Sequence, residues 1–302
     1  MDPGAILERF LDRPRVAYVR AVLDTYGDAA GGLLANGLAF AALFATIPVA
    51  LVTLGLAGWL AADPRIQAAL AATLIRALPP LADLINGAVD ALQTGAAVAS
   101  IVGIVGLIWT VSQLYVALDV AFARIYSATP ARDPFRRAAR GFLWVGLLLA
   151  GAVAAIVVAT MATIADAVAP DGIPAASAVR GALTSLPVLA AMAIGTVAVI
   201  YRVLPPDPPA WRSVRLPAVV AGLGIVGLSQ VFLLVAPRLV GVAALVGTLA
   251  TAFVALAWLS FTFQVLLYGA AWVRVRDERR LLDAASALSG PAATAESRSG
   301  GQ

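Results

Sequence analysis

The chain has 302 residues, of which 61% are hydrophobic and only 13% are charged, and its mean hydropathy is +0.92. That charged share is about half of what ordinary soluble domains carry, so it supplies too little polar surface to cover a large soluble core. The formal net charge is +4, and all 21 basic residues are arginine. The composition excludes an ordinary soluble domain and indicates an integral membrane protein.

The sequence contains neither cysteine nor histidine. A disulfide framework, a thiolate metal site, a Ser-His-Asp triad and an H-E-x-x-H zinc site are therefore all excluded. Lysine is absent as well. The sequence therefore contains no G-x-x-x-x-G-K-[ST] loop, the motif of a nucleotide-binding P-loop. We expect no enzyme activity, no metal and no cofactor.

Residues 1–32 form the predicted cytoplasmic N-terminal segment. Arginines and acids alternate there with apolar residues, and no apolar stretch follows a basic start. Such a pattern does not fit a cleaved signal peptide. It predicts short amphipathic helices that lie against the membrane face.

Six later runs are long enough to cross a bilayer, which takes about 20 apolar residues per helix. We place them at Leu33–Ala61, Gly95–Leu118, Gly141–Ala165, Ala182–Leu204, Leu216–Ala236 and Val242–Trp272. The last run is long, and its start near Pro237–Gly241 is interpreted as an interfacial or re-entrant piece. The predicted fold is an all-α polytopic membrane protein whose six-helix domain covers residues 33–275.

The connection over residues 62–94 is the only long one on the external side. Asp63 and Pro64 are typical of a helix start, and Pro79-Pro80 would end that helix. Apolar residues recur at helical spacing beyond the break. We predict an external amphipathic helical hairpin, which is either an interfacial brace or a lid over a cavity.

Orientation follows from the excess of basic residues that cytoplasmic loops carry. Seventeen of the 21 arginines fall on the side that holds both termini, and four fall on the other. We therefore expect both termini in the cytoplasm. Residues 276–302 form a cytoplasmic tail, predicted to be disordered from about residue 284 because little there can be buried.

The basic face is expected to meet anionic lipid headgroups, since membrane-flanking arginines are attracted to them. No basic stretch is interleaved with aromatic residues as a strand-binding groove requires. We therefore expect membrane lipids and no nucleic acid as partners. The sequence leaves the oligomeric state open.

Polar residues inside the second predicted span are the main candidates for a functional site. Trp109, Ser112, Tyr115 and Asp119 are spaced to fall on one helix face, with Gln113 just off it. Intramembrane polar groups usually face the bundle interior or a cavity. The stripe is interpreted either as a substrate site or as a structural feature in which Asp119 pairs with an arginine.

Two residues of the first span complete the candidate set. Asn36 either bridges helices by hydrogen bonds or contributes to the substrate site. Pro48 removes a backbone donor and is expected to kink the helix, which makes it a candidate hinge.

Several stretches together resemble the YihY/virulence factor BrkB family of bacterial inner-membrane proteins. In chain order they are Asn36–Pro48, Trp109–Ser112, Tyr201–Pro205, Val246–Ala250 and Tyr268–Ala270. Two departures stand out: Phe40 replaces a tyrosine common in the family, and Ala271 replaces an expected glutamate. The resemblance implies six transmembrane helices and, from suggestions for some relatives, a role in transporting envelope lipids or amphiphiles.

Two main functional hypotheses follow. The first is a transporter-like protein that exposes Asn36, Ser112, Gln113, Tyr115 and Asp119 to a cavity opened at Pro48. Its substrate would be a lipid or an amphiphilic envelope precursor, since the bundle offers few charges for a small ion. The alternative is a non-catalytic scaffold, which the abundance of small packing residues favours. A membrane hydrolase is a third hypothesis.

Overall fold

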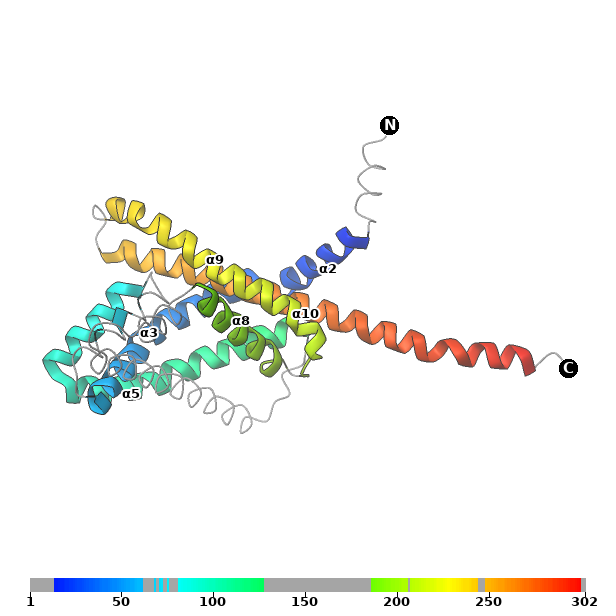
Figure 1. Cartoon of the computed structure of the whole chain (residues 1–302), viewed down its shortest axis with the longest axis horizontal. Coiled ribbons are helices and arrows are strands. Elements are labelled where there is room, and N and C mark those ends of the chain that lie inside the picture. Colours follow the sequence, from blue (N-terminus) through cyan, green and yellow to red (C-terminus); the bar gives the residue numbers. More distant parts are fainter. Residues whose placement is uncertain are drawn as a thin grey trace, which may run out of the picture.

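The computed structural model describes residues 14–61, 81–127, 186–205, 207–243 and 248–299, together with positions 68, 71, 72 and 75. The regular structure of these residues is helical. The long helices are α2 (Pro14–Asp28), α3 (Gly31–Ala61), α5 (Ala82–Ile125), α8 (Leu186–Val203), α9 (Trp211–Ala243) and α10 (Thr248–Ser299). Figure 1 shows that α2 and the last part of α10 project from the same end of the bundle.

Among the described residues, five helical segments are long and apolar enough to cross a membrane. They are Gly31–Val52, Gly103–Ile125, Leu186–Val203, Trp211–Val235 and Ala252–Ala287. Each overlaps one of the predicted runs. The predicted third run, 141–165, lies outside the described residues.

Helix α5 differs from the prediction at its start. The second arm of the predicted hairpin and the second predicted span belong to one helix of 44 residues, Ala82–Ile125. The predicted break between these two pieces is absent, because the helix continues through Thr94 and Gly95 without interruption. In Figure 1 the ribbon changes direction between its cyan first part and its green last part. Most of the first arm, 62–80, lies outside the described residues, and the external placement of the hairpin stays a prediction.

Helices α9 and α10 also extend beyond their predicted ends. Helix α9 continues through Pro237 to Ala243, so Pro237–Gly241 is helical and does not form a separate re-entrant piece. Helix α10 continues to Ser299, whereas the sequence predicts disorder from about residue 284. The side chains of residues 281–287 are exposed, and a helix without packing partners has marginal stability in water.

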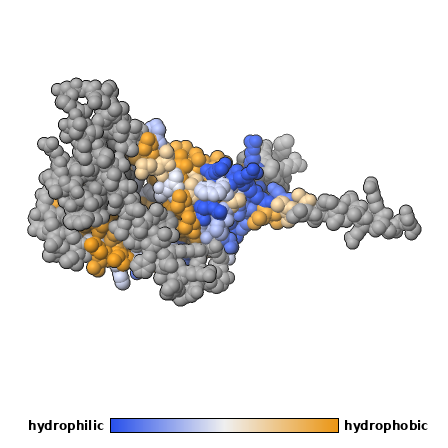
Figure 2. Space-filling view, turned by 60° about the horizontal axis from the view of Figure 1, so that its bottom comes forward, coloured by the Kyte–Doolittle hydropathy of each residue, from blue (hydrophilic) through white to orange (hydrophobic). Residues whose placement is uncertain are grey.

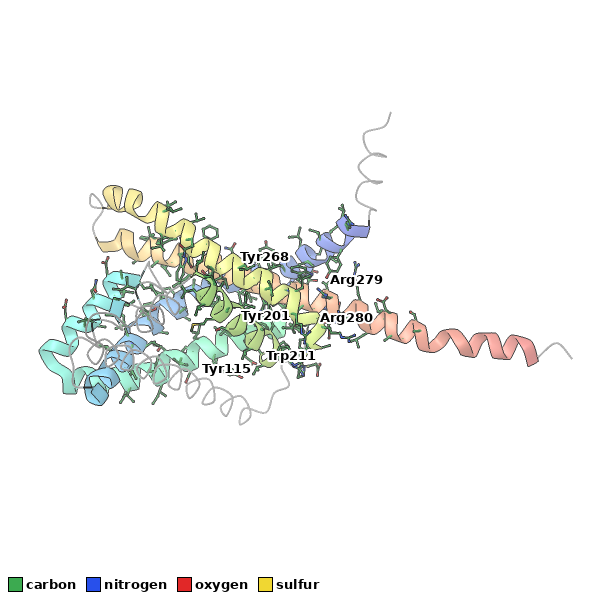
Figure 3. The ribbon with its side chains drawn as sticks, viewed as in Figure 1. Tyr115, Tyr201, Trp211, Tyr268, Arg279 and Arg280 are labelled. Carbon is green, nitrogen blue, oxygen red and sulfur yellow. The ribbon has the colours of Figure 1, made fainter. Side chains whose placement is uncertain are left out.

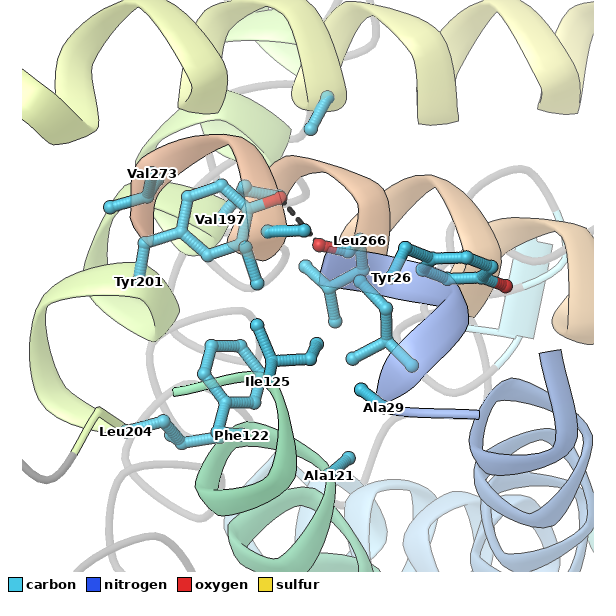
Figure 4. Packing of buried hydrophobic residues seen from close by; sticks show 14 of the residues in the cluster. Tyr26, Ala29, Ala121, Phe122, Ile125, Val197, Tyr201, Leu204, Leu266 and Val273 are labelled. Carbon is cyan, nitrogen blue, oxygen red and sulfur yellow. Dashed lines mark hydrogen bonds between the residues drawn. The ribbon is translucent and has the colours of Figure 1, made fainter. Parts of the chain in front are cut away.

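The main core lies where these helices meet (Figure 4). Leu38 of α3, Phe122 of α5, Tyr201 of α8 and Leu267 of α10 are fully buried in it. The Tyr201 hydroxyl donates a hydrogen bond to the backbone oxygen of Leu266 at 2.7 Å. A tyrosine that is buried in an apolar core and hydrogen-bonded in this way ties α8 to α10.

Close helix contacts depend on small residues. A Cβ at Gly222 of α9 would lie 2.8 Å from the backbone nitrogen of Ile194 in α8, and a Cβ at Gly106 of α5 would lie 3.2 Å from Pro48 in α3. Helices associate in membranes through such close packing rather than through the hydrophobic effect. The small residues of these spans therefore have a structural role.

The pH dependence of stability gives a first prediction. Tyr26 is buried and stacks on Tyr268 with ring centroids 3.7 Å apart. Burial, and then the neighbouring Tyr268, raises the pKa of Tyr26 to about 12, against about 10 for an unfolded tyrosine. The folded state keeps the proton that the unfolded state loses, so this contribution to stability is complete below about pH 10 and is lost as the pH rises toward about 12.

We expect the melting temperature of the detergent-solubilised protein to fall over that alkaline range. Tyr26→Phe should make this fall shallower, because phenylalanine has no proton to lose. The check is a series of thermal unfolding curves for both proteins from neutral to alkaline pH. Equal slopes for the two proteins would contradict the assignment.

Candidate functional site

A chain of three polar side chains joins α3 to α10. The Ser260 hydroxyl donates to Asn36 Oδ1 at 2.5 Å, and Gln264 Nε2 donates to Ser260 Oγ at 3.3 Å. Ser260 and Gln264 are one helical turn apart on α10, and Ser260 makes the contact to α3 while Gln264 supports Ser260 from the next turn. Asn36 therefore bridges α3 and α10 in the structure, and its partner Ser260 is 224 positions away in the sequence.

This polar chain lies at the outer surface of the bundle. Asn36 is exposed, and Ser260 and Gln264 are partly exposed. The exposed rings of Phe40 and Phe44 follow Asn36 on the same face of α3, with centroids 4.8 Å apart. Amide groups beside aromatic rings on a surface of membrane-spanning helices are uncommon, because polar groups there are costly.

Two hydrogen-bonding groups of the polar chain remain unused. Among the residues that the structure describes, the Asn36 amide nitrogen and the Gln264 carbonyl oxygen have no partner. The first group is a donor and the second an acceptor. The surface therefore presents one hydrogen-bond function of each kind.

The stripe predicted on α5 is divided between two environments. Trp109 is 68% exposed, whereas Tyr115 and Asp119 are 5% and 2% exposed. Because each residue turns the helix by about 100°, Trp109 and Tyr115 differ by about 120° in direction. The structure therefore brings Tyr115 and Asp119 together on the buried side, where neither is without an interaction, and leaves Trp109 on the outside.

The other two α5 candidates do not join this buried pair in a common cavity. Gln113 is exposed. The Ser112 hydroxyl donates to the backbone oxygen of Ile108 within its own helix, at 2.5 Å. Figure 3 shows Tyr115 on α5.

Pro48 lies within α3, and the helix continues through it to Ala61. Its ring is buried against Gly106 of α5. The Thr46 hydroxyl bonds the backbone oxygen of Ala42 at 3.0 Å, which is a local bond within the same turn. Pro48 therefore has a packing role, and its role as a hinge stays a prediction.

One set of polar contacts, around a single turn of α10, was not predicted from the sequence. We call it the charged end, and it consists of Arg274, Asp277 and Glu278 with their partners. Arg274 donates to the backbone oxygen of Ile125 and to Ser127 Oγ, the latter at 2.9 Å, and pairs with Glu278 at 2.6 Å. Because Ile125 is the last residue of α5, Arg274 satisfies a carbonyl that the helix leaves unbonded.

Asp277 binds the start of α9, as Arg274 binds the end of α5. Its Oδ1 accepts hydrogen bonds from Ser213 Oγ at 2.7 Å and from the backbone nitrogen of Ala210 at 3.3 Å. Arg280 donates to Ser213 Oγ at 3.4 Å. A carboxylate at a helix N-terminus caps the free N–H groups and is favoured by the helix dipole.

Tyr126 lies beside the charged end. Burial raises the pKa of its hydroxyl, as do the negative charges of Asp277 and Glu278, against the opposing effect of Arg274. The hydroxyl is buried and has no hydrogen-bond partner in the structure. It therefore stays protonated and adds no charge to this end.

The described residues hold no group of three or more Asp or Glu side chains that could bind a metal ion. Their polar groups form the α3–α10 chain, the buried pair on α5 and the charged end. Helices of this length and apolarity define a polytopic membrane protein.

The chain belongs to the virulence factor BrkB family, whose model matches residues 22–293. This match covers nearly the whole chain and confirms the family predicted from the sequence. No curated protein and no solved structure matched the chain.

Proposed function

We propose that the protein binds and transports a lipid or amphiphilic envelope component in the bacterial inner membrane, without covalent chemistry. The observation that carries this proposal is the outward-facing polar chain of Asn36, Ser260 and Gln264. An apolar tail would lie along Phe40 and Phe44, while the polar part of the molecule would reach the amides. Both environments meet within two turns of α3.

The hydrogen-bonding groups of the polar chain favour one kind of ligand. The free donor of Asn36 suits an ester or amide oxygen, and the free acceptor of Gln264 suits a hydroxyl or amine. None of the three side chains of the polar chain is charged. We propose that it contacts the uncharged linkage region of an amphiphile, and that Ser112, Gln113, Tyr115 and Asp119 serve the same ligand elsewhere on its path.

The proposal includes the topology. We propose six spans, the third over residues 141–165, with both termini in the cytoplasm. The arginine distribution supports this orientation, as does the projection of α2 and α10 from one end of the bundle. The charged end would then face the cytoplasm.

The test is lipid mass spectrometry of the purified protein and of the triple variant Asn36→Leu, Ser260→Ala, Gln264→Leu. We expect one lipid species to be enriched over the bulk membrane and to fall about tenfold or more in the variant, because each lost hydrogen bond weakens binding by about 1 kcal/mol. The control is Gln230→Leu, which removes an exposed amide from α9 and should retain the species.

A second candidate function is the scaffold. The close contacts at Gly222 and Gly106 favour it, because they show a bundle built for tight packing. Bulk lipid in all three preparations would reject the lipid-binding proposal and favour the scaffold. The next experiment would then be cross-linking from the charged end to protein partners.

A further inference from the structure

Helix α2 packs against α10 at the place where α10 leaves the bundle. The Trp272 indole nitrogen donates to the Tyr18 hydroxyl at 2.8 Å. The guanidinium of Arg279 lies over the Tyr18 ring, 4.5 Å from its centroid. Figure 3 shows Arg279 on the side of α10 nearer α2 and Arg280 nearer the start of α9.

Three arginines border this contact. Positions 272, 276 and 279 share one face of α10 because they are spaced by four and three residues, so Arg276 lies between Trp272 and Arg279. Arg15 is one turn before Tyr18 on α2. We call the surface formed by Arg15, Tyr18, Trp272, Arg276 and Arg279 the α2–α10 basic patch.

None of the three arginines is neutralised by a neighbour. Among the described residues, ion pairs join Arg20 to Asp24 and Arg274 to Glu278, and no carboxylate pairs with Arg15, Arg276 or Arg279. Asp283 is one turn beyond Arg279 and is exposed. The α2–α10 basic patch therefore carries three positive charges that no carboxylate of the described residues pairs with.

The sequence around the α2–α10 basic patch is typical of the place where a helix leaves the membrane. Residues 248–273 of α10 contain no charged side chain, and Arg274 is the first. Trp272 and Tyr18 come at the end of this uncharged stretch, and such residues are enriched where the membrane meets water. Figure 2 shows hydrophilic residues gathered next to the apolar surface where α10 leaves the bundle.

We propose that the α2–α10 basic patch binds the phosphate of an anionic phospholipid. Guanidinium groups bind phosphate oxygens through paired hydrogen bonds, and the Tyr18 ring fixes one of these guanidinium groups. Because Tyr18 and Trp272 are residue types typical of the membrane surface, the proposed phosphate is that of a lipid rather than a free anion. This inference does not depend on the proposed transport function.

The test measures lipids that remain bound to the full-length protein in native mass spectrometry, with phosphatidylglycerol or phosphatidylcholine added to the detergent. We expect phosphatidylglycerol to bind at least about tenfold more tightly than phosphatidylcholine, because headgroup charge separates them. The double variant Arg276→Gln, Arg279→Gln should lose most of this preference. Millimolar inorganic phosphate should not displace the lipid.

The matched control is Arg212→Gln, Arg215→Gln. It removes the same charge from exposed positions at the start of α9 and should keep the preference. Equal losses in the two double variants would overturn the proposal, because they would show general attraction to a basic surface. Displacement by inorganic phosphate would overturn it too, and would indicate a site for soluble anions.

The fold of each variant is checked by its unfolding curve in detergent. If the first double variant unfolds, the single substitution Arg279→Gln provides the test, since this side chain is exposed. It should weaken phosphatidylglycerol binding about fivefold, and unchanged binding would overturn the proposal.

Discussion

Gly269→Ala is expected to destabilise the protein by about 3 kcal/mol, through overpacking and a broken buried hydrogen bond. A Cβ at this position would lie 2.0 Å from the Tyr201 hydroxyl and 2.9 Å from its ring. Tyr201 is completely buried and packs against Phe122, so its ring has no free space to enter. The substitution must therefore push α8 away from α10 or break the bond to Leu266.

The measurement is the thermal unfolding midpoint in detergent, and the matched control is Gly227→Ala. That glycine is also in a membrane-spanning helix, but a Cβ there meets no atom within 4 Å. Its midpoint should stay the same or rise slightly, because alanine favours the helix over glycine. Similar midpoints for the two variants would contradict the packing argument.

The double variant Gly269→Ala, Tyr201→Phe tests whether the contact with the Tyr201 hydroxyl causes the loss of stability. It removes the oxygen atom that the new methyl group would meet, so the double variant should be less unstable than the sum of the single effects. Additive effects would show that the methyl group destabilises through another contact.

Asp277→Ala is expected to lower the stability by about 2 kcal/mol. It removes the carboxylate that caps α9 and leaves the fully buried Ser213 hydroxyl without its acceptor. Asp277→Asn should have a smaller effect, because it keeps an acceptor oxygen and loses only the charge. Unfolding curves of the two variants give the comparison.

Asp24→Ala is the control for this prediction. Asp24 pairs with Arg20 at 3.6 Å on an exposed face of α2, and exposed pairs contribute about 0.5 kcal/mol or less. If both aspartate variants lost the same small amount, the capping role of Asp277 would be wrong.

The apolar runs predicted the membrane-spanning helices well, because a run of about 20 apolar residues has few other structures. The run at Ala182–Leu204 became α8, Leu186–Val203. Helix ends were less predictable. The apolar spacing beyond Pro79-Pro80 suggested a separate amphipathic helix, but helix hydrogen bonds continue through polar and apolar residues alike, and α5 runs from Ala82 to Ile125.

The candidate site was predicted only in part. Asn36 was predicted as a polar group of interest, but its partner Ser260 was not, because no local pattern links two positions so far apart. The spacing of Trp109 and Tyr115 suggested a shared face, and only the neighbouring helices decide which part of that face is covered. Asp277 looked like an ordinary charged residue of a tail, since its partners Ala210 and Ser213 belong to another helix.

The charged end has a mechanical consequence. Arg274 and Asp277 are neighbours on one turn of α10, and they hold the last turn of α5 and the first turn of α9. Rotating or sliding α10 by one residue would break both connections together. A motion that preserves both connections must keep these ends of α5, α9 and α10 together, so the three helices would separate first at the opposite end of the bundle.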